Sequence, residues 1–395
     1  MFFNTTILLV FLLILFGVGV LFVSLFVPDI LYWRKARKIR KTERTSSEPS
    51  NSLNNFESDL RNASVRMIES GEKIAFPALR GDTFMSRARY FYKTRKREAI
   101  DGGDESAFHL DWSECGWIVY ALAEDYANLQ YISRVYSEKI LPLPLKMINH
   151  SQLGMVALLL FEKTANDNYK IFADKIYSFI RKQDSKYGVL YRQNIRNQIV
   201  DVVGMAVPFL IKYGMLFSDE EALKLAEKTV SQYIKYGCDR VTGMPAFAFQ
   251  LEAPHIKCGA TNWGRGCAWF VIGLSYVNIN NFDNDTQSMI DKLDSSLVKL
   301  WETDGFFGHF ISQGPRDLSA ELPIVYYLYK KRLINIEEHQ LLSYSTMCHN
   351  GIMYNSSSEN HGIISYGMPC GPNALSQAYM IRLINLYKEM HPKYS

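Results

Sequence analysis

The sequence lacks the short motifs that identify several large enzyme classes. It contains no phosphate-binding loop, no dinucleotide-binding glycine fingerprint and no Gly-x-Ser-x-Gly turn. Its 395 residues include only six cysteines, which form no CxxC pair, and the candidate histidines lack the i, i+4 spacing of a zinc-binding helix. The net charge is only +4, and no basic face suits nucleic acid. We therefore expect no cofactor, no metal ion and no nucleic-acid partner.

One long apolar run is present near the N-terminus. After a short tail of residues 1–6, residues 7–27 are apolar apart from two glycines and one serine, which is long enough to cross a bilayer. A cleaved signal peptide is the alternative, but the tail has no Lys or Arg and residues 23–27 make a poor cleavage site. The run therefore predicts one N-terminal transmembrane helix that anchors the protein in a membrane.

Basic residues follow this run between residues 34 and 44. Because basic flanks stay on the cytoplasmic side, we predict a single-pass protein of the inner (cytoplasmic) membrane whose large domain is cytoplasmic. Free cysteines agree with a reducing compartment. Residues 28–55, which end in a Ser-, Glu- and Asn-rich stretch, are interpreted as a basic juxtamembrane segment and flexible linker.

From residue 56 to the end, the apolar periodicity is helical and strand-like alternation is scarce. Pairs of periodic segments separated by short polar breaks predict helical hairpins. The predicted helices span residues 113–126, 152–161, 169–180, 202–213, 220–236, 269–277, 286–301, 318–331, 336–347 and 374–390. Residues 56–395 are therefore predicted to form one all-α domain.

Turns that combine glycine with apolar residues recur between the hairpins. They contain Gly188, Gly243, Gly305 and Gly351, which are spaced by 55, 62 and 46 residues. Such spacing marks a helical-hairpin repeat, and about six units fit the domain. Six hairpins closed into a ring give an (α/α)6 double-layered helical barrel. Its long loops would open on one rim, where binding and catalytic residues gather.

Two aspartates precede apolar helical segments. Asp201 is interpreted either as an N-cap, which accepts backbone N–H bonds, or as a partly buried carboxyl that gives and takes a proton. Asp317 offers the same choice. Its following residues Ser319 and Glu321 complete a polar first helical turn, which favours the cap.

The stretch from Gly259 to Trp269 is the second candidate site. It puts an indole, Trp263, beside a guanidinium, Arg265, with two glycines that allow close backbone approach. Trp offers a flat face for a sugar ring, and Arg a forked donor for a carboxylate. The alternative is a loop-to-helix junction with a packed Trp.

Four further residues are candidates for substrate binding in the predicted rim loops. A role in binding is a hypothesis for each of them, since a lone histidine is more often solvated or structural. The candidates are Trp112, Asn149, His150 and His255.

The segments that begin at Asp201, Trp263 and Asp317 resemble, in order and spacing, the unsaturated glucuronyl and rhamnogalacturonyl hydrolases of glycoside hydrolase families 88 and 105. The resemblance covers about residues 60–390 and implies an (α/α)6 barrel that acts on an oligosaccharide. It implies that Asp201 protonates the C4=C5 double bond of a terminal unsaturated uronic acid and activates water onto C5. Trp263 and Arg265 would hold the sugar ring and its carboxylate.

The chain departs from the family pattern at two positions. Asn149 stands where the family has a second aspartate, and Phe247 stands where it has a histidine. His150 and His255 are the nearest candidates to take over binding. One alternative is therefore a glycan-binding or polysaccharide-assembly protein that has lost catalysis. A sugar epimerase that uses His150 and His255 is the other.

Overall fold

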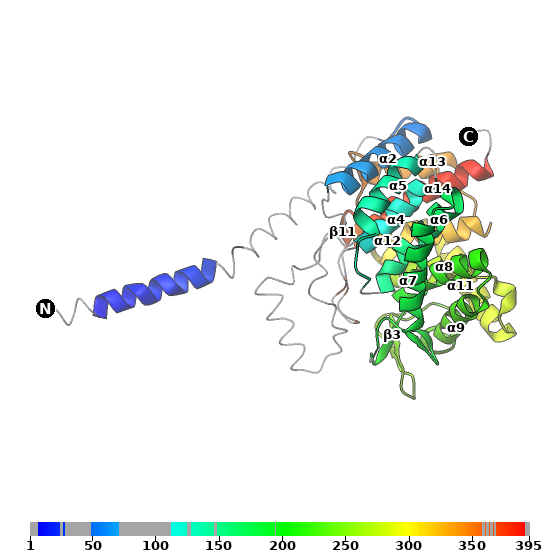
Figure 1. The fold of residues 1–395 in the computed structure, drawn as a ribbon, viewed down its shortest axis with the longest axis horizontal. Helices are drawn as coiled ribbons and strands as arrows, with labels where there is room; N and C mark the ends of the chain where they lie inside the picture. The colour runs from blue at the N-terminus through cyan, green and yellow to red at the C-terminus, as the bar shows by residue number, and fades with distance from the viewer. Residues whose placement is uncertain are drawn as a thin grey trace.

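The computed structural model describes eleven parts of the chain. They are residues 7–23, 27, 49–70, 112–124, 128–145, 148–193, 195–357, 360, 363, 366 and 369–391. Helices form most of the described structure, and short strands lie in the loops between them (Figure 1).

Long helices form a closed inner ring. Each packs against the next, and the last packs against the first, so the ring has no free edge. In order around the ring they are α4 (Trp112–Ala123), α6 (Ser151–Thr164), α8 (Asp201–Phe217), α10 (Gly264–Leu274), α12 (Leu318–Lys330) and α14 (Ala374–Met390). Residues of α8 and α10 are buried almost throughout, because these helices lie between the barrel interior and a second layer.

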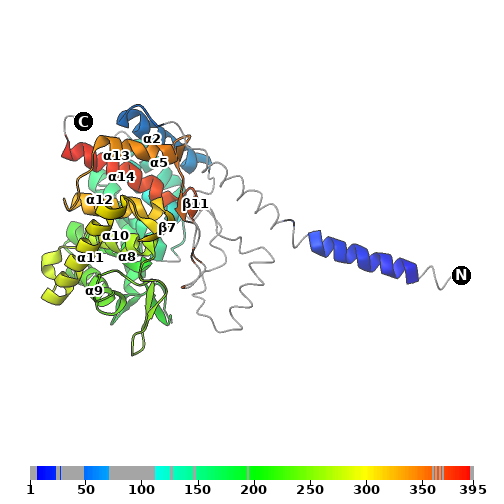
Figure 2. The same cartoon turned by 180° about the vertical axis from the view of Figure 1, so that it is seen from behind.

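The second layer consists of the helices that return between the inner ones. α7 packs on α6, α9 on α8, α5 on α4, and α2 on α14. Figures 1 and 2 show α2 and α14 side by side although they stand at opposite ends of the domain. The outer helices are α2 (Leu53–Ser70), α5 (Leu129–Val135), α7 (Asp167–Arg181), α9 (Glu220–Gly237), α11 (Asn284–Asp304) and α13 (Glu338–Ser343), with short turns η2 (Tyr136–Ile140), η3 (Ile148–His150), η4 (Ile279–Asn281) and η5 (Tyr344–Met347). The helical part agrees with the predicted (α/α)6 barrel.

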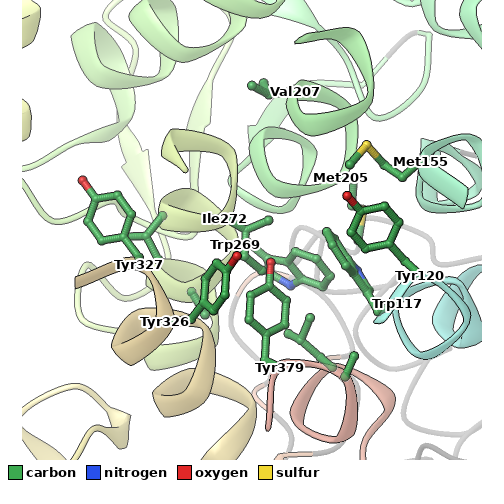
Figure 3. Packing of buried hydrophobic residues seen from close by; sticks show 14 of the residues in the cluster. Trp117, Tyr120, Met155, Met205, Val207, Trp269, Ile272, Tyr326, Tyr327 and Tyr379 are labelled. Carbon is green, nitrogen blue, oxygen red and sulfur yellow. The ribbon is translucent and has the colours of Figure 1, made fainter. Parts of the chain in front are cut away.

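Large aromatic side chains from different inner helices fill the barrel interior (Figure 3). The ring centroid of Trp117 lies 6.4 Å from that of Trp269 and 5.6 Å from that of Tyr379. Tyr326 packs edge-on against Tyr379 at 5.4 Å. The interior is therefore a packed core, and access for a ligand is confined to the ends of the barrel.

An ion pair fastens the ring where α14 meets α4. Arg382 of α14 is 4% exposed, and its Nε donates to Glu124, directly after α4, at 3.1 Å. Its Nη2 donates to the hydroxyls of Tyr276 and Tyr326 at 3.2 Å each. Because a buried guanidinium is costly unless its charge is paired, these contacts favour the arrangement in which α14 meets the ends of α4 and α10 and the side of α12.

Short antiparallel strands stand in the loops before the inner helices. The largest sheet pairs β3 (Asn197–Ile199) with β4 (Ala248–Gln250), and β4 with β5 (Lys257–Cys258). Two-stranded hairpins pair β1 (Asp184–Ser185) with β2 (Gly188–Val189), β6 (Gly308–Phe310) with β7 (Gln313–Arg316), β8 (Cys348–His349) with β9 (Ile352–Met353), and β10 (Ser356–Ser357) with β11 (Pro369–Gly371). Strands this short show no alternation in the sequence, so the all-α prediction missed them.

Most predicted helices match the observed ones closely, but α10 begins at Gly264 rather than at 269. The two glycines in its first turn suggested a loop. They are present because of close packing: a Cβ on Gly264 would lie 2.3 Å from the carbonyl oxygen of Gly308. Tertiary contact therefore overrides the low helix propensity of glycine at this end.

The prediction of a transmembrane helix over residues 7–27 is wrong. In the part of the chain that the structure describes, no helix is both long and apolar enough to cross a membrane. The single-pass inner-membrane location with a cytoplasmic domain depended on this span and is wrong with it. The basic residues between 34 and 44 lie outside the described residues.

The repeat glycines adopt the left-handed conformation, with φ of 79° at Gly351 and 70° at Gly305. A Cβ on Gly351 would lie 2.2 Å from the carbonyl oxygen of Asp59 in α2, whereas Gly305 has open space around it. We expect Gly351→Ala to lower the unfolding free energy by roughly 3 kcal/mol or more, and the control Gly305→Ala by about 1 kcal/mol. Urea unfolding measures both, and equal losses would contradict the docking role of Gly351.

Candidate active site

The N-terminal ends of the inner helices gather at one rim of the barrel. Asp201 is the first residue of α8, Trp263 is the N-cap of α10, and Asp317 is the N-cap of α12. Neighbouring inner helices run in the same direction because an outer helix returns between each pair. Helix N-terminal ends carry a partial positive charge, so this rim favours an anionic ligand.

Asp201 is not an N-cap. The N-cap position is Val200, whose side chain makes no cap bond, and Asp201 already belongs to the helix. The residue is half-buried, and its Oδ2 is buried. Burial raises the pKa of Tyr366, and the negative charge of Asp201 adds to the rise, which places the two side chains within electrostatic range.

Three rim loops line up beside Asp201. The backbone N–H of Val200 donates to the Phe247 carbonyl at 2.9 Å, and that of Phe247 donates to the Ala260 carbonyl at 3.1 Å. The Ala260 N–H in turn donates to the Tyr366 hydroxyl at 2.6 Å. Because paired strands lie about 4.8 Å apart, these bonds hold the three loops side by side next to Asp201.

Trp263 is only 2% exposed. The ring centroid of Phe247 lies 4.7 Å from its own in an edge-on contact, and that of Tyr366 lies 5.5 Å away. A Cβ on Gly266 would lie 2.5 Å from the indole, so the glycine is required for this packing. The paired rim loops next to Asp201 form what we call the wall. In this structure Trp263 supports the wall and offers no open stacking face.

Arg265 is also buried, at 7% exposure. Its Nη1 donates to the Ser357 carbonyl at 2.8 Å, and its guanidinium carbon lies 5.5 Å from the Trp263 ring. Its charge also acts on Asp317. The guanidinium therefore lies in the same wall and supplies positive charge to the rim from below its surface.

Asp317 is fully buried, and the cap interpretation is confirmed. Its Oδ1 accepts from the Ser319 N–H at 3.0 Å, the Ser319 hydroxyl at 2.6 Å and the Ser357 N–H at 3.0 Å. Its Oδ2 lies 3.4 Å from His309 Nδ1. Burial acts to raise the pKa of Asp317, but the hydrogen bond from His309 and the charge of Arg265 hold that pKa below its usual range.

Asn149 and His150 lie in η3, which packs against both α8 and α4. The hydroxyl of the next residue, Ser151, donates to the Met205 carbonyl of α8 at 2.6 Å. Asn149 Oδ1 is buried and has no hydrogen-bond partner in the described structure. Both residues therefore stand beside the helix that carries Asp201. Trp112 begins α4 at the same rim, and its side chain lies outside the described residues.

His255 is not brought to Asp201. Its Nδ1 lies 3.0 Å from the Gln250 carbonyl, and its ring lies 4.4 Å from that of Tyr236 on outer helix α9. In the sheet, Phe247 stands at the Asp201 end of β4 and Gln250 at the other end. Three residues of strand, about 10 Å, separate the two ends.

Three residues of this wall were missed in the sequence: His309, Ser357 and Tyr366. His309 and Ser357 meet at Asp317 although 48 residues separate them. They stand in irregular loops that show no apolar periodicity, so nothing local marks them. A signal exists only for His309, which follows the repeat turn at Gly305 at the position where a rim loop begins.

We expect Asp317→Asn to lower the unfolding free energy by about 1–3 kcal/mol at neutral pH, because the amide keeps one acceptor but loses the charge. The lowered folded-state pKa means that the charge stabilises the protein above the unfolded pKa, about 3.9. That stabilisation is lost as the pH falls through the folded-state pKa. Urea unfolding of both proteins between neutral and acidic pH measures this, and a difference that stays constant below pH ~4 would exclude the charged state.

Solved structures share this fold. A possible member of the GH105 family from Klebsiella pneumoniae subsp. pneumoniae is 16% identical with a TM-score of 0.66, and the alignment covers 87% of this chain and 96% of that one. An unsaturated glucuronyl hydrolase specific for heparin is 12% identical with a TM-score of 0.58, covering 86% and 97%. The GH76A alpha-1,6-mannanase from Salegentibacter is 12% identical with a TM-score of 0.53, covering 85% and 99%.

The sequence itself identifies the family. No curated protein matches the chain. Residues 103–389, which include every rim residue described above, match the sequence profile of Glycosyl Hydrolase Family 88. Because this match spans well over half of the chain, the protein belongs to glycosyl hydrolase family 88.

Proposed function

We propose that this protein is a hydrolase that hydrates the C4=C5 double bond of a terminal unsaturated uronic acid on an oligosaccharide. The observation that carries the proposal is Asp201, a half-buried carboxyl that begins an inner helix without capping it. It stands at the rim where the positive helix ends of the barrel converge, which suits a sugar carboxylate. Membership of family 88 supports this reaction class.

In the proposed reaction Asp201 acts first as an acid. Its proton goes to C4 while the oxygen of a water molecule bonds to C5, and the proton released by that water returns to the carboxylate. The product at C5 is a hemiketal, which opens to a ketone and releases the rest of the oligosaccharide. Proton loss and gain balance at Asp201, so no cofactor is required by the chemistry.

The neighbours of α8 divide the binding roles. Since α6 and α10 flank α8, Asn149 and His150 stand on one side of Asp201, and Trp263 and Arg265 on the other. We assign the first pair to hydrogen bonding with the sugar. The second pair shapes the wall and supplies the positive charge that attracts the uronate. Tyr366 contributes a hydroxyl and Trp112 begins the remaining rim segment.

A glycan-binding protein without catalysis is the second candidate. Asn149 supports it, because an amide carries no negative charge and cannot exchange a proton as a second carboxyl would. Phe247 supports it too, since it replaces a possible polar contact by an apolar ring against Trp263. The two candidates differ in whether the double bond is consumed.

We expect Asp201→Asn to reduce hydration of an unsaturated glucuronyl or galacturonyl disaccharide by 10²-fold or more, because the amide cannot transfer the proton. The loss of ultraviolet absorbance of the conjugated double bond measures the rate. The control is Asp285→Asn, an exposed acid in the first turn of outer helix α11, which should keep the full rate. If the wild type leaves the double bond intact, the binding candidate replaces the enzyme.

The substitution Asn149→Asp tests the opposite side of the site. A carboxylate there would add a second proton-exchanging group near Asp201, and we expect kcat to rise about tenfold or more if Asn149 limits the present rate. KM and kcat measured on the same disaccharide separate the effects. A fall in kcat would show that the amide is itself required, in which case Asn149 binds the substrate.

A further inference from the structure

A cationic and aromatic surface lies at the end of β4 that is remote from Asp201. We call it the outer ledge. It consists of the exposed Lys186 and Lys235, the half-buried Tyr236 and His255, and the buried ring of Tyr187. These residues come from three segments: the β1–β2 turn, the last turn of α9 and the loop between β4 and β5. Figures 1 and 2 show the hairpin that follows β4 protruding beyond the helices.

The rings of the outer ledge are held together by mutual contacts. Tyr187 and Tyr236 have ring centroids 5.8 Å apart, and His255 lies 5.5 Å from the first and 4.4 Å from the second. The Tyr187 hydroxyl donates to the carbonyl of Leu251 in the protruding hairpin. The surface is therefore preorganised and needs little ordering when a ligand binds.

The backbone of His255 is strained in a way that keeps its ring in this surface. Its φ is +58°, a left-handed conformation that a bulky residue seldom adopts. The N–H of His255 donates to the Glu252 carbonyl at 2.9 Å, and Nδ1 lies 3.0 Å from the Gln250 carbonyl. With Nδ1 engaged, Nε2 is the atom that remains for another partner. Strain that persists in a half-buried loop residue points to a binding role.

The cations of the outer ledge are not used by the fold as ion pairs. Lys186 and Lys235 are exposed, and neither makes a salt bridge with the part of the chain that the structure describes. Their ammonium groups lie over the rings of Tyr187 and Tyr236 at 4.9 and 5.2 Å. By contrast, nearby Lys228 is paired with an aspartate at 2.6 Å.

Further charges extend this surface. Arg196 and Lys257, also exposed, belong to the same sheet region because Arg196 accepts a backbone bond from Leu251 and Lys257 is paired with Phe249. The acidic group on the hairpin is the exposed Glu252. Asp239 interacts with Lys257, and Asp283 interacts with Lys235. Four cations therefore face three acids, so the surface complements a polyanion.

We propose that the outer ledge binds an acidic group, carboxylate or sulfate, of an oligosaccharide whose terminal sugar lies at Asp201. The strand β4 leads from the ledge to the rim over about 10 Å, which is longer than one sugar ring, so the ledge holds a sugar further along the chain. The direction in which the oligosaccharide runs from Asp201 to the ledge rests on the function proposed above. Binding of an acidic group at the ledge does not rest on that function. Such binding would give His255 a role apart from the rim.

The experiment measures binding of saturated oligosaccharides, which carry no double bond and are not turned over. Isothermal calorimetry on the full chain uses an oligogalacturonate, a heparin-derived oligosaccharide and neutral maltooligosaccharide of equal length. For the double variant Lys186→Glu with Lys235→Glu we expect affinity for the acidic probes to fall about tenfold at low salt, with a weaker salt dependence. Preference for one acidic probe identifies its anionic group.

Two further variants make the result specific. His255→Asn should weaken acidic binding while keeping the loop, because asparagine tolerates positive φ. Lys299→Glu, an exposed charge reversal on α11, should leave affinity unchanged. The proposal is overturned if the double variant binds as the wild type does, if Lys299→Glu weakens binding equally, or if the neutral probe binds as tightly. Failure of the proposed reaction shows instead as an unconsumed double bond, whatever the affinities are.

Discussion

The barrel depends on the ion pair that joins its last inner helix to its first. Arg382 is buried against Glu124, and its guanidinium lies 4.7–5.2 Å from the rings of Tyr120, Tyr326 and Tyr379. A buried charge without such partners would cost several kcal/mol. The side chain therefore favours closure of the ring, because its partners come from α4, α12 and α14 together and are assembled only when these helices meet. Aromatic packing alone would fill the interior without this selectivity.

Closure of the ring has a direct consequence for chemistry. With every inner helix parallel to its neighbours, the N-terminal ends fall at one rim and their partial charges add. The loops that precede these helices must then approach one another, and the structure shows how tightly they do so. Gly264 and Gly266 allow α10 to pack against the β6 backbone and against its own N-cap Trp263. The rim is rigid because buried contacts hold it from below.

The sequence predicted the helices well because their apolar periodicity is local. The choice at Asp317 was also accessible, since Ser319 and Glu321 stand in the next turn. The contacts that build the wall were not accessible. Arg265 and Asp317 are linked through Ser357. No sequence pattern near residue 357 indicates that its carbonyl binds Arg265, 92 residues away. Trp263 was interpreted as a stacking face because sequence reports residue type and not the rings of Phe247 and Tyr366 that cover it.

Burial of Trp263 and Arg265 changes what the rim can recognise. A guanidinium under the surface attracts an anionic group through charge over several ångströms but gives less geometric selectivity than a bidentate contact. Selectivity must then come from the less buried rim residues, which are Asn149 and Tyr366. His150, at 6% exposure, is as buried as Arg265. The burial of Trp263 and Arg265 also makes the contacts proposed for sugars beyond the terminal one more important for recognition. A site that is permissive where the reaction occurs distinguishes between ligands most simply through contacts with the rest of the oligosaccharide. The β3–β4–β5 sheet is the element that connects the rim to such contacts.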